Sequence, residues 1–117
     1  MLNNSPKTLF EKIWDQHVVV PETEDTPAIL YIDLHLIHEV TTPQAFTQLK
    51  ESNLSVRAPD KVLATMDHST PTVPIKTIND LDLVAESGPA QQIRDMIKNC
   101  QDFGIELYGF DSDRRGI

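Results

Sequence analysis

The sequence predicts one α/β domain built on parallel strands, and two features of the chain support this fold class. Short apolar runs rich in β-branched and aromatic residues predict buried strands at residues 28–33, 62–66 and 105–108, the first with an irregular continuation to residue 40. Segments in which apolar residues recur at helical spacing separate these runs. Because strands that alternate with helices form parallel βα units, we expect a parallel sheet.

Two helices are predicted in the first half of the chain. Apolar residues recur at helical spacing over residues 8–17, where Thr8 and Glu11 fit a capping box that satisfies free N–H groups of the first turn. Thr42 and Pro43 predict the start of a second helix that continues to about residue 50. Threonine caps helices well, and proline suits the first helical position.

The clearest helix of the sequence begins at Gly88-Pro89 and carries an apolar stripe that includes Cys100. It is expected to end before Gly104, because glycine adopts the left-handed conformation of a helix C-terminal cap. The preceding segment, residues 69–87, contains prolines and no regular pattern. We expect a long loop there, and loops of that length within compact domains are often functional or mobile.

Composition narrows the class of protein. The chain has 117 residues, of which 39% are hydrophobic and 24% charged, as in globular domains. Its formal net charge of −8 argues against nucleic acid or an anionic membrane as partner, because phosphates bind basic faces. Cys100 is the single cysteine, so a reducing compartment is expected. With no signal-peptide pattern and no membrane-spanning run, we expect a cytoplasmic protein.

The predicted strand at residues 62–66 ends in an adjacent acid and imidazole, Asp67 and His68, followed by a turn rich in Ser, Thr and Pro. A carboxylate beside an imidazole holds one tautomer, which makes histidine a usable acid or base near neutral pH. Successive strand residues point to opposite faces, so the two side chains meet only if the strand ends there. From the dipeptide alone, a structural role is favoured over catalysis by about two to one.

His35 and His38 have the spacing His-x-x-His, which suits a metal ion on one helical face with Asp33 or Glu39 as an oxygen ligand. The segment is predicted to be extended, where positions three apart face opposite sides, so a structural zinc site is not expected. For His35 we favour a hydrogen-bonded place at the margin of a strand, whereas the role of His38 stays open. Cys100 is expected to be a small buried hydrophobe.

Four blocks of the sequence carry a resemblance to a known family: TLFEKIWDQHVV, YIDLHLIHEVTTPQAF, ATMDHSTPT and IKNCQDFGIELYGFDS. In this order they resemble the opening of the large subunit of 3-isopropylmalate dehydratase (isopropylmalate isomerase), in the aconitase superfamily. The resemblance implies a hydro-lyase of L-leucine biosynthesis that interconverts 2-isopropylmalate and 3-isopropylmalate by dehydration and rehydration. It also implies a partial parallel sheet of the three-layer α/β/α type, the N-terminal portion of an aconitase-like first domain.

The resemblance further implies a cofactor, a partner and site residues. In the full-length family a [4Fe–4S] cluster with one iron lacking a cysteine ligand acts as a Lewis acid on the substrate, and a separate small subunit completes the site. Asp67 and His68 match the family's Asp-His pair near the cluster, so we assign them a catalytic role in which His68 assists loss of the hydroxyl group. His38 matches a substrate-contacting position, so we assign it substrate binding.

The resemblance leaves the cluster ligands unaccounted for. The family's three cluster cysteines lie downstream of these blocks, and Cys100 does not match any of them. We therefore expect residues 1–117 to be a single incomplete N-terminal segment of the catalytic domain, without a bound cluster or activity of its own. Uncovered sheet edges and helix faces predict marginal stability or self-association. The alternative is a non-catalytic fragment or a small α/β module that binds a partner such as the dehydratase small subunit.

Overall fold

The computed structural model describes residues 5–84 and 86–115, so Ala85, within the predicted loop, and residues 116–117 lie outside the described part. The chain divides into two compact units, Met1–Asp33 and Leu34–Ile117. Each unit is described by itself. Among the described residues, no helix is both long enough and apolar enough to cross a membrane.

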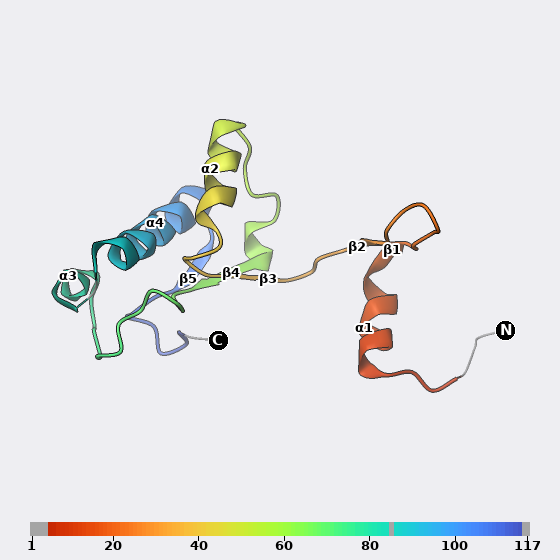
Figure 1. Cartoon of the computed structure of the whole chain (residues 1–117), viewed down its shortest axis with the longest axis horizontal. Coiled ribbons are helices and arrows are strands. Elements are labelled where there is room, and N and C mark those ends of the chain that lie inside the picture. The colour runs from red at the N-terminus through yellow and green to blue at the C-terminus, as the bar shows by residue number, and fades with distance from the viewer. Residues whose placement is uncertain (1–4, 85, 116–117) are drawn as a thin grey trace. The chain divides into compact units, whose positions relative to one another are not determined.

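The described part of the first unit, residues 5–33, contains one helix and a small hairpin. Helix α1, Leu9–His17, begins at Thr8, and the predicted capping box is confirmed. The Thr8 N–H donates to the Glu11 carboxylate at 2.6 Å, and the Glu11 N–H donates to the Thr8 hydroxyl at 3.2 Å. Strand β1, Val18–Val20, follows the helix directly (Figure 1).

The prediction of a buried strand at residues 28–33 is wrong. Only Ile29–Leu30 form a strand, β2, which pairs antiparallel with β1, and both side chains are exposed. The backbone of this segment makes its hydrogen bonds to residues nearby in the sequence. The chain folds back on β1, and the Tyr31 N–H donates to the His17 carbonyl at 2.8 Å. The first core strand is β3, His35–Ile37, which the sequence had indicated only as an irregular continuation.

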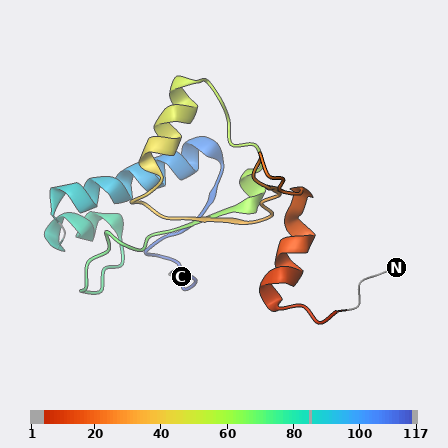
Figure 2. The ribbon, with the colours of Figure 1, turned by 45° about the vertical axis from the view of Figure 1, so that its right-hand side comes forward.

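The second unit is built on a three-stranded parallel sheet, which confirms the predicted fold class. Its order is β3-β4-β5, with β4 at Val62–Thr65 and β5 at Glu106–Tyr108. Ile37 of β3 lies opposite Ala64 of β4, which lies opposite Leu107 of β5. Helices α2, Pro43–Glu51, and α4, Ser87–Phe103, lie on one side of this sheet (Figures 1 and 2). A single turn of 3₁₀-helix, η1, Pro59–Lys61, leads into β4.

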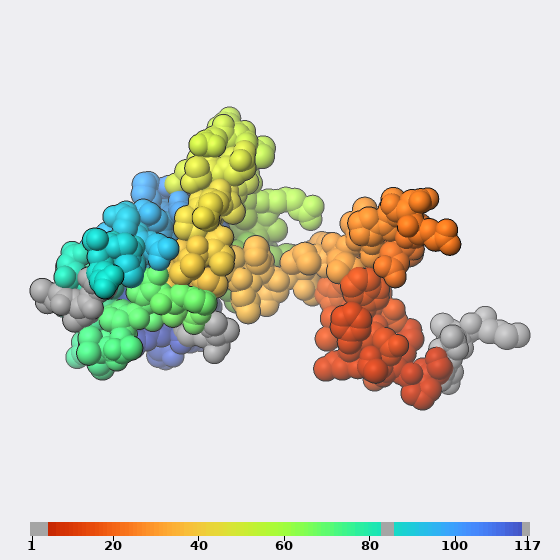
Figure 3. Space-filling view, viewed as in Figure 1, coloured from red at the N-terminus to blue at the C-terminus, as the bar shows by residue number. Residues whose placement is uncertain are grey.

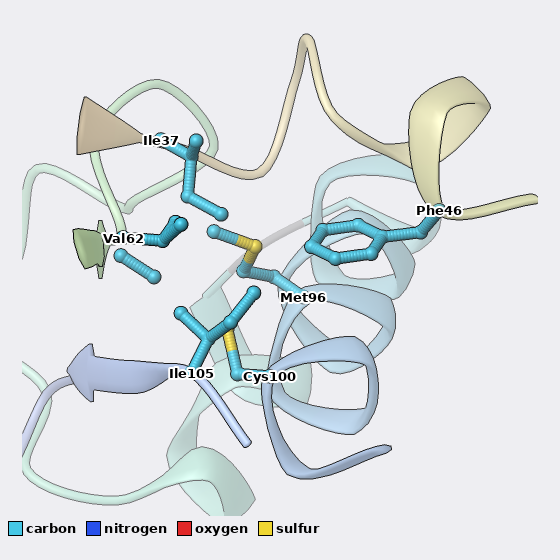
Figure 4. Packing of buried hydrophobic residues seen from close by; sticks show 7 residues of the cluster. Ile37, Phe46, Val62, Met96, Cys100 and Ile105 are labelled. Carbon is cyan, nitrogen blue, oxygen red and sulfur yellow. The ribbon is translucent and has the colours of Figure 1, made fainter. Parts of the chain in front are cut away.

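The main core of this unit fills the space between the sheet and the two helices. Figure 4 shows side chains from β3, β4, the residue before β5 and the two helices pointing toward one another: Ile37, Phe46, Val62, Met96, Cys100 and Ile105. The Phe46 ring packs on that of Phe103 at a centroid distance of 5.2 Å, which holds α2 against α4. The atoms of α2 lie directly against those of α4 in the space-filling view (Figure 3). Cys100 is 2% exposed, as expected for a buried hydrophobe.

Helices α2 and α4 differ in how their ends are closed. Pro43 occupies the first turn of α2 as predicted, but Thr42 makes no side-chain cap. Its hydroxyl instead donates backward to the carbonyl of His38 at 2.7 Å. The C-terminal prediction for α4 is confirmed, because Gly104 has a φ of 67° and its N–H donates to the last helical carbonyls.

The predicted loop at residues 69–87 is only partly irregular. It contains the 3₁₀-helix η2, Ile78–Asp80, and the short helix α3, Leu81–Val84. The sequence pattern missed these elements because each is about one turn long and lacks a repeating apolar face. The segment is anchored by a second cluster of buried side chains, formed by Met66, Ile75, Leu81, Ala90 and Ile93.

Candidate functional site

The candidate site lies where two neighbouring parallel strands end. His38 directly follows β3, and Asp67 and His68 follow β4 after one intervening residue. Because the two strands are parallel and in register, their carboxyl ends lie at the same edge of the sheet. Such edges are where α/β folds commonly place their binding residues, because loops of varied sequence follow the rigid strands there.

The side chains of Asp67 and His68 are in contact, which the sequence analysis expected only if the strand ended before them. The strand ends at Thr65, and the Asp67 carboxylate Oδ2 lies 2.6 Å from Nδ1 of His68. A carboxylate only accepts hydrogen bonds, so Nδ1 carries a proton. In the neutral ring, Nε2 therefore carries the lone pair and is the atom at which His68 takes up or releases a proton. The His68 side chain is 55% exposed, which leaves that atom accessible.

His38 lies against His68, an approach that the sequence alone does not reveal. The two imidazole rings stack with centroids 4.3 Å apart and planes 17° from parallel. The N–H of Val40 donates to Nδ1 of His38 at 3.3 Å, so the proton of the neutral His38 ring is on Nε2. That atom faces the hydroxyl of Thr41 at 3.4 Å. The contacts fix both the ring and its tautomer.

Glu39 is a residue of the site that sequence reasoning weighed only as a possible metal ligand. It is fully buried, and its carboxylate accepts the backbone N–H groups of Asp67 at 2.9 Å and of Ser69. Burial alone would raise the pKa of Glu39. These two N–H groups, with smaller contributions from those of Glu39 itself and His68, bring its pKa below the usual value. The sequence shows that an acidic residue, Glu39, follows His38, but it does not show that this side chain is buried.

The turn after His68 is held by further hydrogen bonds. The Ser69 hydroxyl donates to the side-chain carbonyl of Gln92 on α4 at 2.6 Å. The Thr70 hydroxyl donates to the backbone carbonyl of Asp67 at 3.2 Å. The turn is therefore tied internally, to α4 and, through Glu39, to the end of β3.

The remaining sequence candidates lie outside this constellation. His35 is exposed at the start of β3, and Cys100 is buried in the main core, where desolvation raises its pKa to about 11. Among the residues that the structure describes, no three His, Cys, Asp or Glu side chains are grouped so that they could bind a metal ion. The structure therefore gives no support to the His-x-x-His metal site that we considered.

Comparison with known proteins agrees with the resemblance. The chain is 57% identical to the 3-isopropylmalate dehydratase large subunit of Roseiflexus castenholzii over 112 residues, covering 96% of this chain and 24% of that protein. It is 52% identical to the large subunit from Anaeromyxobacter dehalogenans, covering 97% of this chain and 24% of the relative. For the Listeria monocytogenes large subunit the identity is 50%, covering 95% and 22%. The chain thus spans about a quarter of the length of these relatives.

The comparison with solved structures found no match. The comparison with family models found one that matches residues 11–117, nearly the whole chain, and it is described as the aconitase family (aconitate hydratase). That match includes the ends of β3 and β4 with all the residues of the candidate site. On this evidence, the chain belongs to the aconitase family.

Proposed function

We propose that this chain supplies the acid–base part of the active site of a hydro-lyase that interconverts 2-isopropylmalate and 3-isopropylmalate in L-leucine biosynthesis. Its relatives carry the name of that enzyme's large subunit. The observation that carries the proposal is the Asp67–His68 pair, an accessible imidazole whose Nδ1 is 2.6 Å from a carboxylate. As part of a protein about four times longer, residues 1–117 would be a single incomplete segment of its catalytic domain.

The geometry suits removal and return of a hydroxyl group. With Nδ1–H held by Asp67, a protonated His68 can donate its Nε2 proton to the hydroxyl of the substrate, which then leaves as water. The alkene forms when a separate base takes the proton from the neighbouring carbon, and we assign that base to no residue of this chain. The neutral ring can take a proton back from water when the alkene is rehydrated. We assign His38 substrate binding, because its ring lies 4.3 Å from that of His68 and a bound molecule at His68 would meet both. Asp67 keeps His68 in the required tautomer throughout.

The described residues do not fit the [4Fe–4S] cluster that the full-length family implies. Such a cluster needs several thiolates, and this sequence has one cysteine. Cys100 is 2% exposed inside the core, and desolvation raises its pKa to about 11, which opposes formation of the thiolate. The cluster ligands must therefore come from residues beyond this chain. The name of the relatives, large subunit, implies a small subunit, and we propose it as the partner in the complete enzyme.

The first experiment uses the 117-residue chain itself. After incubation with iron and sulfide under reducing conditions, we expect no visible absorbance from a bound cluster and no turnover of isopropylmalate. A stable cluster with turnover would show that the chain is sufficient alone, against our proposal. Purification with the dehydratase small subunit tests the proposed partner. A stable complex fits both this proposal and the alternative of a non-catalytic partner-binding module, and the second experiment separates the two.

The second experiment tests the acid–base role. A full-length hybrid large subunit is made, in which this chain replaces the matching segment of the Roseiflexus castenholzii relative. The turnover of this full-length hybrid is measured together with the small subunit of that relative. His68→Gln keeps the polarity of the side chain but cannot transfer a proton, so we expect turnover to fall about 10²- to 10⁴-fold. Asp67→Asn should lower it as well. The matched control is His35→Gln, an exposed histidine on β3, which should leave turnover within about twofold. Equal effects at His35 and His68 would refute the assignment.

A further inference from the structure

The buried carboxylate of Glu39 links the two chain segments that carry the stacked imidazoles. Glu39 directly follows His38 at the end of β3, and its two oxygens reach the turn after β4. Oε2 accepts the N–H of Asp67 at 2.9 Å, and Oε1 accepts the N–H of Ser69. These donors are the backbone groups on either side of His68.

Burying this carboxylate is costly, so its presence needs a physical reason. Glu39 has no exposed surface, and none of the ion pairs within the described residues includes it. An apolar side chain of similar volume would fill the core without this desolvation cost. What such a side chain lacks is two acceptor oxygens that can bind two separate N–H groups of one turn. The contacts therefore favour a role in fixing that turn.

Fixing the turn also fixes the ring that it carries. With the N–H groups of Asp67 and Ser69 both held, the backbone at His68 cannot rotate without breaking a hydrogen bond to the buried Glu39 carboxylate. The direction of the His68 side chain follows from that backbone. The observed result is a ring 4.3 Å from that of His38 and 2.6 Å from the Asp67 carboxylate, although the His68 side chain is 55% exposed.

We propose that Glu39 is a positioning residue of the site: its buried carboxylate holds the N–H groups of Asp67 and Ser69 and thereby sets the His68 ring against His38. Glu39 does not touch the reacting atoms and acts through His68. The significance of this placement for turnover rests on the proposed function. The placement itself can be tested without any activity.

The informative substitution is Glu39→Gln, which keeps the size of the side chain but replaces one acceptor oxygen with an NH₂ donor. Only one of the two N–H groups can then be accepted, and the other meets a donor. In nuclear magnetic resonance spectra of the ¹⁵N-labelled chain, we expect hydrogen exchange at Asp67 or Ser69 to accelerate at least about tenfold. The ring-proton shifts of His38 and His68 should move toward those of free imidazole, because the stack loosens.

The matched control is Asn99→Ala, which disturbs the other buried polar side chain found among the described residues of the second unit. Asn99 is 8% exposed and accepts a hydrogen bond from Lys50 at 2.7 Å, away from the turn. We expect it to lower stability but to leave the histidine ring shifts unchanged. If both variants move the ring shifts equally, Glu39 has only a general structural role and the proposal is overturned.

A measurement on the unsubstituted chain applies even if Glu39→Gln does not fold. The N–H groups of Asp67 and Ser69 lie outside any helix or strand, yet they should exchange at least about tenfold more slowly than that of the exposed Thr72. Equal rates would overturn the proposal. In the full-length hybrid, Glu39→Gln should lower turnover at least tenfold with little change in KM, and unchanged turnover would overturn the functional part. A hybrid that is inactive before substitution counts against the proposed function alone, since the exchange and shift measurements do not depend on activity.

Discussion

Leu81 offers a sharp test of whether the segment after His68 is anchored or loose. The sequence predicts a long loop there, whereas the structure buries Leu81 completely at the start of α3. Its side chain belongs to the second core cluster with Ile75, on the same segment, and Ile93 of α4. Leu81→Ala removes three carbon atoms from a site with no exposed surface. Substitutions of this kind cost about 2–5 kcal/mol, with the larger values where the neighbours cannot collapse into the cavity.

This cost is large relative to the stability of a small domain, which is about 5–15 kcal/mol. Urea unfolding followed by far-ultraviolet circular dichroism measures it, because most helical residues of the second unit lie in α2 and α4. The matched control is Val73→Ala in the same segment, where the side chain is 49% exposed and the expected loss is below about 0.5 kcal/mol. A loss below about 1 kcal/mol for Leu81→Ala, or equal losses for both variants, would show that the segment is not anchored as described.

Three further predictions follow from single residues. Cys100 should react with iodoacetamide at pH 8 at least about a hundredfold more slowly in the folded chain than in urea, since burial raises its pKa from 9.0 to about 11; equal rates would contradict this. Gly104→Ala should lower the free energy of unfolding by about 1 kcal/mol, because φ at this residue is 67°. Gly88→Ala should be neutral or stabilising, since both sites have open space around the added carbon but only Gly104 has a positive φ. The urea midpoints of the two variants measure this difference. Because the pKa of Glu39 is lowered, its stabilisation should be complete above pH 4.5 and be lost as the pH falls below that value. The stability advantage of the chain over Glu39→Gln should therefore shrink in acid, and a constant difference from pH 6 to pH 3 would contradict the assignment.

The features that sequence reasoning placed correctly are governed by local interactions. The capping box at Thr8 and Glu11 involves residues three positions apart, and the end of α4 depends on the freedom of Gly104 to adopt positive φ. The central strand β4 also lies where its apolar run predicts. These signals need no knowledge of distant parts of the chain.

The errors concern which distant segments pair. The apolar run at residues 28–33 satisfies the pattern of a buried strand, but its backbone pairs with β1 in a local hairpin, and β3 takes the place in the parallel sheet. An apolar run of sequence does not indicate which other strand its backbone will pair with. Thr42 shows the same limit at the level of one side chain, because its hydroxyl bonds the His38 carbonyl instead of capping α2.

The candidate site combines both kinds of information. The Asp67–His68 contact is local and could be anticipated once the strand was expected to end there. The stacking of His68 on His38 and the bond from Ser69 to Glu39 join positions about thirty residues apart, and they exist only because β3 and β4 are neighbours in register. The sequence therefore indicated the candidate acid–base pair, whereas its placement against His38 required the fold.

The accessibility of His68 bears on what the chain can do alone. Its side chain is 55% exposed. The His38 ring on which it stacks lines, with Leu36 and Tyr108 among others, an open pocket of about 360 Å³. Leu36 is itself 62% exposed. A dehydratase benefits from excluding bulk water, which strengthens the electrostatic interactions in its site and limits side reactions. The described residues leave both the imidazole and this pocket open, so under the proposed function the cover of a working site would come from other polypeptide, as would the ligands of the cluster. We therefore expect His68→Gln to lower turnover about 10²- to 10⁴-fold in the full-length hybrid and to change nothing measurable in the reaction of the isolated chain.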